Sequence, residues 1–145
     1  MNPPSGPLFV TREQAATRQV EAAISALERG EFDIAITLAG AAEGMFDFRK
    51  EGTILEGIAN AERALTHFEK KDWINILNME RNWLKHSSDR TGTIAIELFS
   101  AAFMIARAAS KLTHWTQPLH DFKAWYLGWL STYNPSLPDD QVEPQ

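Results

Sequence analysis

The sequence predicts an all-α fold, a single-domain antiparallel bundle of five to six helices within residues 11–133. Apolar residues recur at steps of three and four through most of the chain, which is the period of a helix with one buried face. No stretch has the alternating pattern of a strand. With 145 residues, 44% of them hydrophobic, the chain is long enough to bury one core. These observations favour a helical bundle over any sheet-containing fold.

The first helix is predicted to begin after Thr11, because Thr11 and Gln14 have the spacing of a capping box. Gly30 is expected to end this helix. A second helix is expected over residues 32–46, where Gly40 and Gly44 would let neighbouring backbones approach closely. The apolar positions share one face of each helix: Ala16, Val20, Ala23, Ile24 and Leu27 in the first, and Ala35, Leu38, Ala39, Ala42 and Phe46 in the second.

Four further segments complete the bundle. A loop over 47–53 leads to a third helix over 54–68, and Asp72 is a plausible cap for a fourth helix over 73–86. Thr93 is expected to cap a fifth helix over 94–112, which is apolar almost all round and should lie at the bundle's centre. Its polar stripe consists of Glu97, Ser100, Arg107 and Lys111. A sixth helix is predicted to begin near Pro118, and it carries Leu119, Phe122, Tyr126, Trp129 and Tyr133.

Composition and charge limit the functions that the chain can have. Residues 1–10 are proline-rich and are expected to form a flexible arm, and residues 134–145 an acidic disordered tail. The absence of cysteine fits a reducing cytoplasm, and neither a secretory signal nor a membrane-spanning run is recognised. A net charge of −5 argues against a protein that coats nucleic acid through bulk charge. Residues 70–90 nevertheless carry a local charge of +2, which favours a focused basic site.

The candidate site is the segment Arg81-Asn82-Trp83-Leu84-Lys85-His86 near the end of the fourth helix. At 100° per residue, Arg81, Lys85, Asn82 and His86 lie on the polar side, away from Leu77 and Leu84. This placement predicts that these four residues lie outside the core, so burial is not the reason that they occur here. Arg81 and His86 are about 140° apart on a straight helix. One copy alone would therefore not bring them together, and a two-fold homodimer pairing these faces would.

The pattern Arg-Asn-x-x-x-His, late on a helix of an all-α bundle, resembles the signature of HEPN domains (higher eukaryotes and prokaryotes nucleotide-binding). The architectural resemblance covers residues 12–133, but only Arg81, Asn82 and His86 match the functional motif. Many members of that family are metal-independent endoribonucleases that act as dimers. Others keep the fold but only bind nucleotides or partner proteins, so the resemblance is compatible with either function.

The resemblance implies a role for each residue. His86 would move the proton of the ribose 2′-hydroxyl or of the leaving oxygen, and Arg81 would neutralise charge on the phosphate. Asn82 would orient the histidine or hold the phosphate, and further phosphate contacts are assigned to Lys85, Asn78 and Arg90. The product would be a 2′,3′-cyclic phosphate. The resemblance also implies a toxin or defence effector with an antitoxin protein as its partner, and neither metal nor cofactor is expected.

Several residues have simpler interpretations. Lys85 and His86 would also be favourable as a solvated basic end of a helix, whose dipole is negative there. Glu43 could be a buried partner of Arg81 or an exposed carboxylate. His67, His114 and His120 lack the spacing of metal ligands. The aromatic residues Trp115, Trp125, Tyr126 and Trp129 favour packing over base stacking, and a tetratricopeptide-like repeat near Gly30 fails because its register is not repeated.

Overall fold

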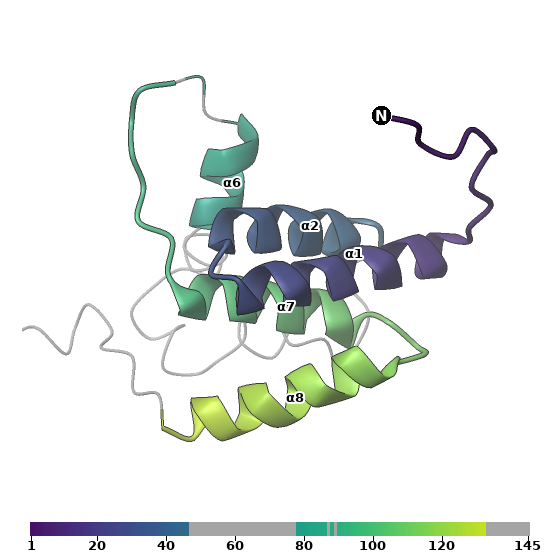
Figure 1. Cartoon of the computed structure of the whole chain (residues 1–145). Coiled ribbons are helices and arrows are strands. Elements are labelled where there is room, and N and C mark those ends of the chain that lie inside the picture. Colours follow the sequence, from purple (N-terminus) through teal and green to yellow (C-terminus); the bar gives the residue numbers. More distant parts are fainter. Residues whose placement is uncertain (47–77, 87, 89, 133–145) are drawn as a thin grey trace, which may run out of the picture.

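A computed structural model describes residues 1–46, 78–86, 88 and 90–132 of the chain. Within these residues all regular structure is helical and no strand occurs, as predicted. The helices are α1 (Arg12–Glu28), α2 (Phe32–Gly44), α6 (Met79–His86), α7 (Leu98–Ser110) and α8 (Gln117–Leu130). Helices α1 and α2 lie side by side, α7 packs below both, α8 lies below α7, and α6 rises above the bundle (Figure 1).

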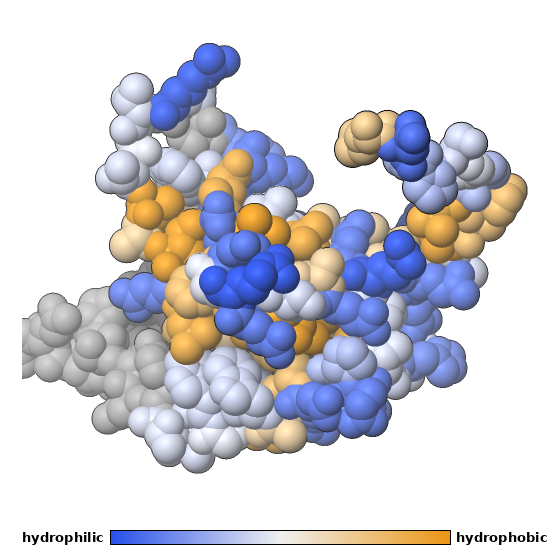
Figure 2. All heavy atoms as spheres, in the orientation of Figure 1, coloured by the Kyte–Doolittle hydropathy of each residue, from blue (hydrophilic) through white to orange (hydrophobic). Residues whose placement is uncertain are grey.

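Some predictions lie outside the described residues: the loop over 47–53, the helix over 54–68, residues 73–77 of the fourth helix, Tyr133 and the acidic tail over 134–145. Residues 1–10 form neither helix nor strand and project away from the bundle (Figure 2). Among the described helices, none combines the length and apolar character needed to cross a membrane.

The boundaries of α1 confirm the sequence prediction. The Thr11 hydroxyl accepts a hydrogen bond from the Gln14 amide at 3.1 Å, and the Gln14 side chain accepts one from the Thr11 amide at 2.9 Å. This reciprocal capping box satisfies amide groups that have no partner within the helix. At the other end Gly30 has φ +75°, a left-handed conformation that glycine adopts without a steric penalty. The chain then turns directly into α2, so the two helices form an antiparallel pair.

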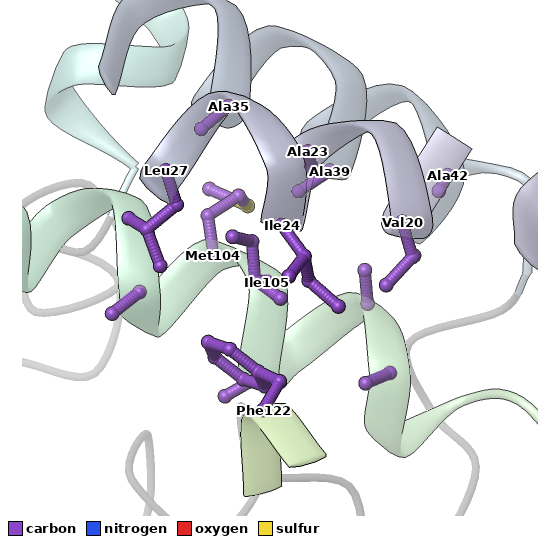
Figure 3. Packing of buried hydrophobic residues seen from close by; sticks show 14 of the residues in the cluster. Val20, Ala23, Ile24, Leu27, Ala35, Ala39, Ala42, Met104, Ile105 and Phe122 are labelled. Atoms are coloured by element: carbon purple, nitrogen blue, oxygen red, sulfur yellow. The ribbon is translucent and has the colours of Figure 1, made fainter. Parts of the chain in front are cut away.

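The core consists mainly of small and branched side chains contributed by four helices (Figure 3). Alanines on α2 allow the backbones to approach closely, and the larger side chains of α1 and α7 fill the remaining space. The labelled residues are Val20, Ala23, Ile24 and Leu27 on α1, Ala35, Ala39 and Ala42 on α2, Met104 and Ile105 on α7, and Phe122 on α8. This packing confirms the predicted core faces of the first two helices, including the partly buried Leu38 and Phe46.

Helix α7 begins later than predicted. It starts at Leu98 with Glu97 at its N-cap, so the proposed cap at Thr93 is wrong. Residues 93–97 are not helical, and their exposure alternates: Ile94 and Ile96 are half-buried, whereas their neighbours are exposed. This two-residue period is that of an extended chain, in which alternate side chains turn towards the body of the protein. The helix itself is buried over 101–109, which confirms its predicted central position.

Helix α8 begins at Gln117 with Pro118 in its first turn, as predicted. Leu119, Phe122 and Tyr126 are buried on one face, and Trp129 packs partly against the core. Burial raises the pKa of Tyr126 to about 12. Trp125 differs from these residues because 42% of its surface is exposed.

Candidate functional site

Helix α6 carries the Arg-Asn-x-x-x-His segment and is attached to the bundle by one face. Leu84 packs partly against the core. One turn earlier, the Glu80 carboxylate accepts a hydrogen bond from the Ser100 hydroxyl at 2.8 Å, which links α6 to α7. These two contacts fix which side of the short helix faces the protein, and they therefore determine where the neighbouring Arg81 lies.

Arg81 lies across the surface of α2. Its Nη1 is 3.0 Å from Oε2 of Glu43, and 22% of its side chain is exposed. The side chain passes over two glycines: a Cβ added at Gly40 would lie 2.9 Å from Nε of Arg81, and one at Gly44 would lie 3.0 Å from Nη2. Gly40 is needed here because a Cβ at this position would overlap the guanidinium group, whereas at Gly44 the contact is tight and involves only the end of the Arg81 side chain. The prediction that burial plays no part at Arg81 is therefore wrong.

Glu43 is the buried anion of a larger ion cluster. Nη2 of Arg107 and Nζ of Lys111 each lie 3.1 Å from its Oε1, and these residues are only 2% and 3% exposed. The structure thus decides between the two interpretations of Glu43: it is a buried partner of Arg81. The polar stripe expected on α7 is not solvated at Arg107 and Lys111, because both side chains point inward at this carboxylate.

The charges of the cluster explain the ionisation of Glu43. Burial raises the pKa of this carboxyl, but the attraction of Arg107, Lys111 and Arg81 outweighs burial and leaves the pKa below its ordinary value. Burial lowers the pKa of Arg107, with Glu43 opposing the shift. Three cations share one carboxylate, so the cluster carries a net charge of +2. Arg81 is its most exposed member and brings this positive charge to the surface.

Lys111 also binds the end of α2 directly. Its ammonium group donates to the backbone carbonyl of Glu43 at 3.1 Å and to that of Phe46 at 3.2 Å. Carbonyls in the last turn of a helix lack partners within the helix, and a cation there interacts favourably with the helix dipole. Lys111 therefore holds the carboxyl-terminal end of α2 and the Glu43 side chain in one arrangement.

The remaining predicted site residues divide into two groups. Asn82, Lys85 and His86 are exposed on α6, and Arg90 is exposed in the connection that follows. Asn78 is instead half-buried, and its amide oxygen accepts a hydrogen bond from Nη1 of Arg107 at 2.7 Å. The structure therefore brings Arg81 and Asn78 to the buried cluster, whereas it leaves the other four residues at the surface.

Sequence reasoning missed Arg107 and Lys111 as members of this site. A signal was present, since two cations four residues apart interrupt an otherwise apolar helix on one side. Such a stripe has two explanations: a solvated face or a shared buried counter-charge. Only the position of Glu43, 64 residues before Arg107, distinguishes them. In the described part of the chain no three His, Cys, Asp or Glu side chains are grouped as metal ligands would be.

Comparison with known proteins does not extend this description. The chain matches no protein-family model, no curated protein and no solved structure. The fold and the site thus define the class only as a helical bundle with a buried, positively charged ion cluster beneath an exposed polar strip.

Proposed function

We propose that this protein is a HEPN-like, metal-independent endoribonuclease that acts as a homodimer. The observation that carries the proposal is the placement of Arg81. Its guanidinium is fixed by Glu43 and two glycines yet partly accessible, and the exposed Asn82 and His86 follow it on the same short helix. A fixed cation from one copy and an accessible imidazole from its two-fold partner would supply charge neutralisation and proton transfer, the two requirements for breaking a phosphodiester.

The proposed reaction is a transesterification within the RNA strand. The imidazole of His86 takes the proton of the ribose 2′-hydroxyl, and the 2′-oxygen attacks the adjacent phosphorus. The bond from phosphorus to the 5′-oxygen of the next nucleotide breaks, and the partner's His86 gives that oxygen a proton. The products are a 2′,3′-cyclic phosphate and a 5′-hydroxyl. No water or metal takes part, so atoms and protons balance with RNA as the sole substrate.

Arg81 contributes by holding the phosphate oxygens as negative charge develops on them. Glu43 fixes one side of the guanidinium, so little side-chain freedom remains to be lost when phosphate binds. The net charge of +2 in the cluster also favours an anion at this surface. Lys85 and Arg90 would bind flanking phosphates, and Asn82 would orient the phosphate or His86.

The second candidate function is a non-catalytic module that binds a nucleotide or a protein partner. The contact between Arg81 and Glu43 favours it, because stabilising a buried carboxylate is a sufficient role for Arg81 without catalysis. Exposed Lys85 and His86 would then bind an anionic group without moving protons. The family resemblance implies a toxin or defence role for the first function, with an antitoxin as partner.

Incubation of purified protein with RNA in EDTA separates these functions. The wild type should produce 2′,3′-cyclic phosphate ends, His86→Ala should abolish them, and Arg81→Lys should reduce cleavage about 100-fold or more, because an ammonium group cannot replace the planar fork of donors. His120→Ala, which changes another exposed histidine, serves as the matched control and should cleave normally. Far-UV circular dichroism would check that each variant is folded.

Two results contradict the nuclease. In the first, the wild type and all variants leave the RNA equally intact. In the second, the wild type cleaves RNA only when a divalent metal is added. The non-catalytic function is supported instead if the wild type leaves RNA intact yet binds a labelled nucleotide. In that case His86→Ala should weaken nucleotide binding, whereas His120→Ala should not.

A further inference from the structure

A groove between α1 and α8 is lined by three carboxylates and, among the described residues, by no basic side chain. Glu21 and Glu28 belong to α1, and Asp121 belongs to α8. The groove has a volume of about 670 Å³, which is within the usual range of roughly 300–1,000 Å³ for small-molecule sites. The hydroxyl of Thr116, the N-cap of α8, donates to Glu21 at 2.6 Å and so holds the two helices together beside the groove. The groove is therefore a concave, negatively charged surface between two connected helices.

The three carboxylates have oxygen atoms left for a ligand. Within the described part of the chain none of them forms an ion pair, and Glu28 accepts no side-chain hydrogen bond. Glu21 accepts one hydrogen bond at Oε1, from Thr116, and Asp121 accepts one at Oδ1, from the Gln117 side chain at 2.8 Å. Because a carboxylate has two acceptor oxygens, the second oxygen of each group remains available.

The neighbouring cations on α1 and α8 do not line the groove. Arg29 follows Glu28 in the sequence, but its guanidinium is bound to Glu31 at 2.7 Å. The ammonium group of Lys123 lies 5.6 Å from the centre of the Trp115 ring. Arg18 lines an adjacent hollow instead of the groove. The negative charge of the groove is thus open to a cation from outside the chain.

The remaining lining of the groove is mainly apolar. Ile24 and Leu27 on α1 are each 8% exposed, and Phe122 on α8 is 6% exposed. The Trp125 ring lies 5.8 Å from the Phe122 ring, and 42% of the Trp125 surface is exposed. Indole attracts a cation more strongly than the other aromatic side chains do. The groove therefore suits a ligand that carries both positive charge and apolar methylene groups.

We propose that the groove binds a linear polyamine. Glu21 and Glu28 are seven residues apart, so they share one face of α1 and lie about 10.5 Å apart along its axis. The terminal nitrogens of an extended triamine with three-carbon and four-carbon spacers have a comparable separation, so each terminal ammonium group meets one of these carboxylates. Asp121 lies on the facing helix one turn before Trp125, and it binds the central amine. The methylene groups lie against Trp125 and the apolar lining.

The spacing of the acids favours this ligand over a single metal ion. A divalent cation needs several oxygen ligands at about 2.0–2.6 Å, which requires carboxylates that converge on one point. Glu21 and Glu28 are instead separated by two helical turns, and the acids of the described residues are not grouped as metal ligands would be. A polyamine distributes its charges along its chain, as the groove distributes its carboxylates.

Titration of nitrogen-15-labelled protein with spermidine tests the proposal. Saturable shifts are expected for the amides of residues 21–28 and 121–125. Magnesium chloride carries charge without methylene groups, so it should shift these amides little at the same concentration. The dipeptide Lys-Lys-amide has the same charge as spermidine on a branched backbone, and it should bind at least about tenfold more weakly. Absent or non-saturable shifts overturn the proposal, as do equal responses to magnesium or tighter binding of the dipeptide.

Variants of the groove give a second test, with calorimetry as the readout. Glu28→Gln should weaken spermidine binding about two- to fivefold, and adding Glu21→Gln should bring the loss to about tenfold. Asp33→Asn is the matched control: it removes an exposed carboxylate of α2 outside the groove, so binding should be unchanged.

Loss of the indole ring gives a third test. Trp125→Leu should weaken spermidine binding about two- to fivefold. Leu127→Ala is its control, because Leu127 is 55% exposed and lies outside the groove. Binding that is unchanged in both Glu28→Gln and Trp125→Leu contradicts the proposal. Since no residue of α6 lines the groove, these results are independent of whether RNA is cleaved.

Discussion

Replacing Glu43 by glutamine tests whether the buried carboxylate holds the bundle together. The substitution preserves the shape of the side chain but removes its negative charge. That charge lies 3.1 Å from the buried cations of Arg107 and Lys111 and 3.0 Å from the guanidinium of Arg81. Two buried cations would then lack their counter-charge. Glu43→Gln should therefore destabilise the protein far more than the loss of an ordinary exposed carboxylate.

The size of the destabilisation expected for Glu43→Gln follows from the number of cations around the carboxylate and from their burial. At an effective dielectric constant of about 20, unit charges about 4 Å apart attract by about 4 kcal/mol, and Glu43 has three such partners. Relaxation and water entry reduce that sum. Removing one partner of a buried ion pair typically costs about 3–5 kcal/mol. Since a domain of this size is stable by only about 5–15 kcal/mol, the variant should be close to its unfolding limit.

Urea unfolding at neutral pH measures this loss, with Asp33→Asn as the matched control. Asp33 is an exposed carboxylate on the same helix, and its loss should cost at most about 1 kcal/mol. The folded-state pKa of Glu43 is lowered, so its contribution is complete above the ordinary value of 4.5 and is lost at lower pH. The difference between wild type and variant should therefore narrow on acidification. A loss below about 1 kcal/mol at neutral pH would refute the assigned role.

Two further predictions concern α2 and the amino-terminal end of α1. Gly40→Ala should destabilise by about 1–3 kcal/mol because its Cβ would lie 2.9 Å from Nε of Arg81, whereas Gly128→Ala, with nothing within 4 Å, should stabilise by about 0.4–1 kcal/mol. Equal shifts in the urea midpoint would contradict this difference. Hydrogen bonds from the Thr113 side chain and backbone lower the pKa of Glu13 to about 2. The stability gained from Glu13 is thus complete above pH 4.5 and lost towards pH 2, so Glu13→Gln should flatten the fall in melting temperature over that range. Parallel pH curves for the two proteins would exclude this contribution.

The features that sequence predicts well depend on neighbouring residues. Thr11 and Gln14 satisfy each other's amides within one turn, Gly30 supplies a left-handed conformation, and Pro118 fits a first helical turn. Each is local chemistry that the sequence displays directly. The start of α7 is predicted too early. Residues 94–97 are extended where the chain approaches the bundle, and this conformation is set by the tertiary structure rather than by the helical preference of the residues.

The site is predictable only in part, for a related reason. Helical angles show which residues share a face, but they do not show which neighbouring helix covers it. These angles assign Arg81 to solvent because Leu84 and its neighbours define a core side, yet α2 covers the adjacent side as well. Arg107 and Lys111 resemble a solvated stripe because their counter-charge lies more than 60 residues earlier.

The shared carboxylate also constrains how this sequence can diverge. A homologue that replaces Glu43 alone would retain two buried cations without compensation, and one that replaces Arg107 alone would weaken the neutralisation of a buried anion. Buried ion clusters can be exchanged for apolar side chains when all members change together. Positions 43, 107 and 111 should therefore covary across relatives, appearing either as an acid with two bases or as three hydrophobic residues. Position 81 is partly exposed and is assigned to phosphate binding, so it should not follow these exchanges.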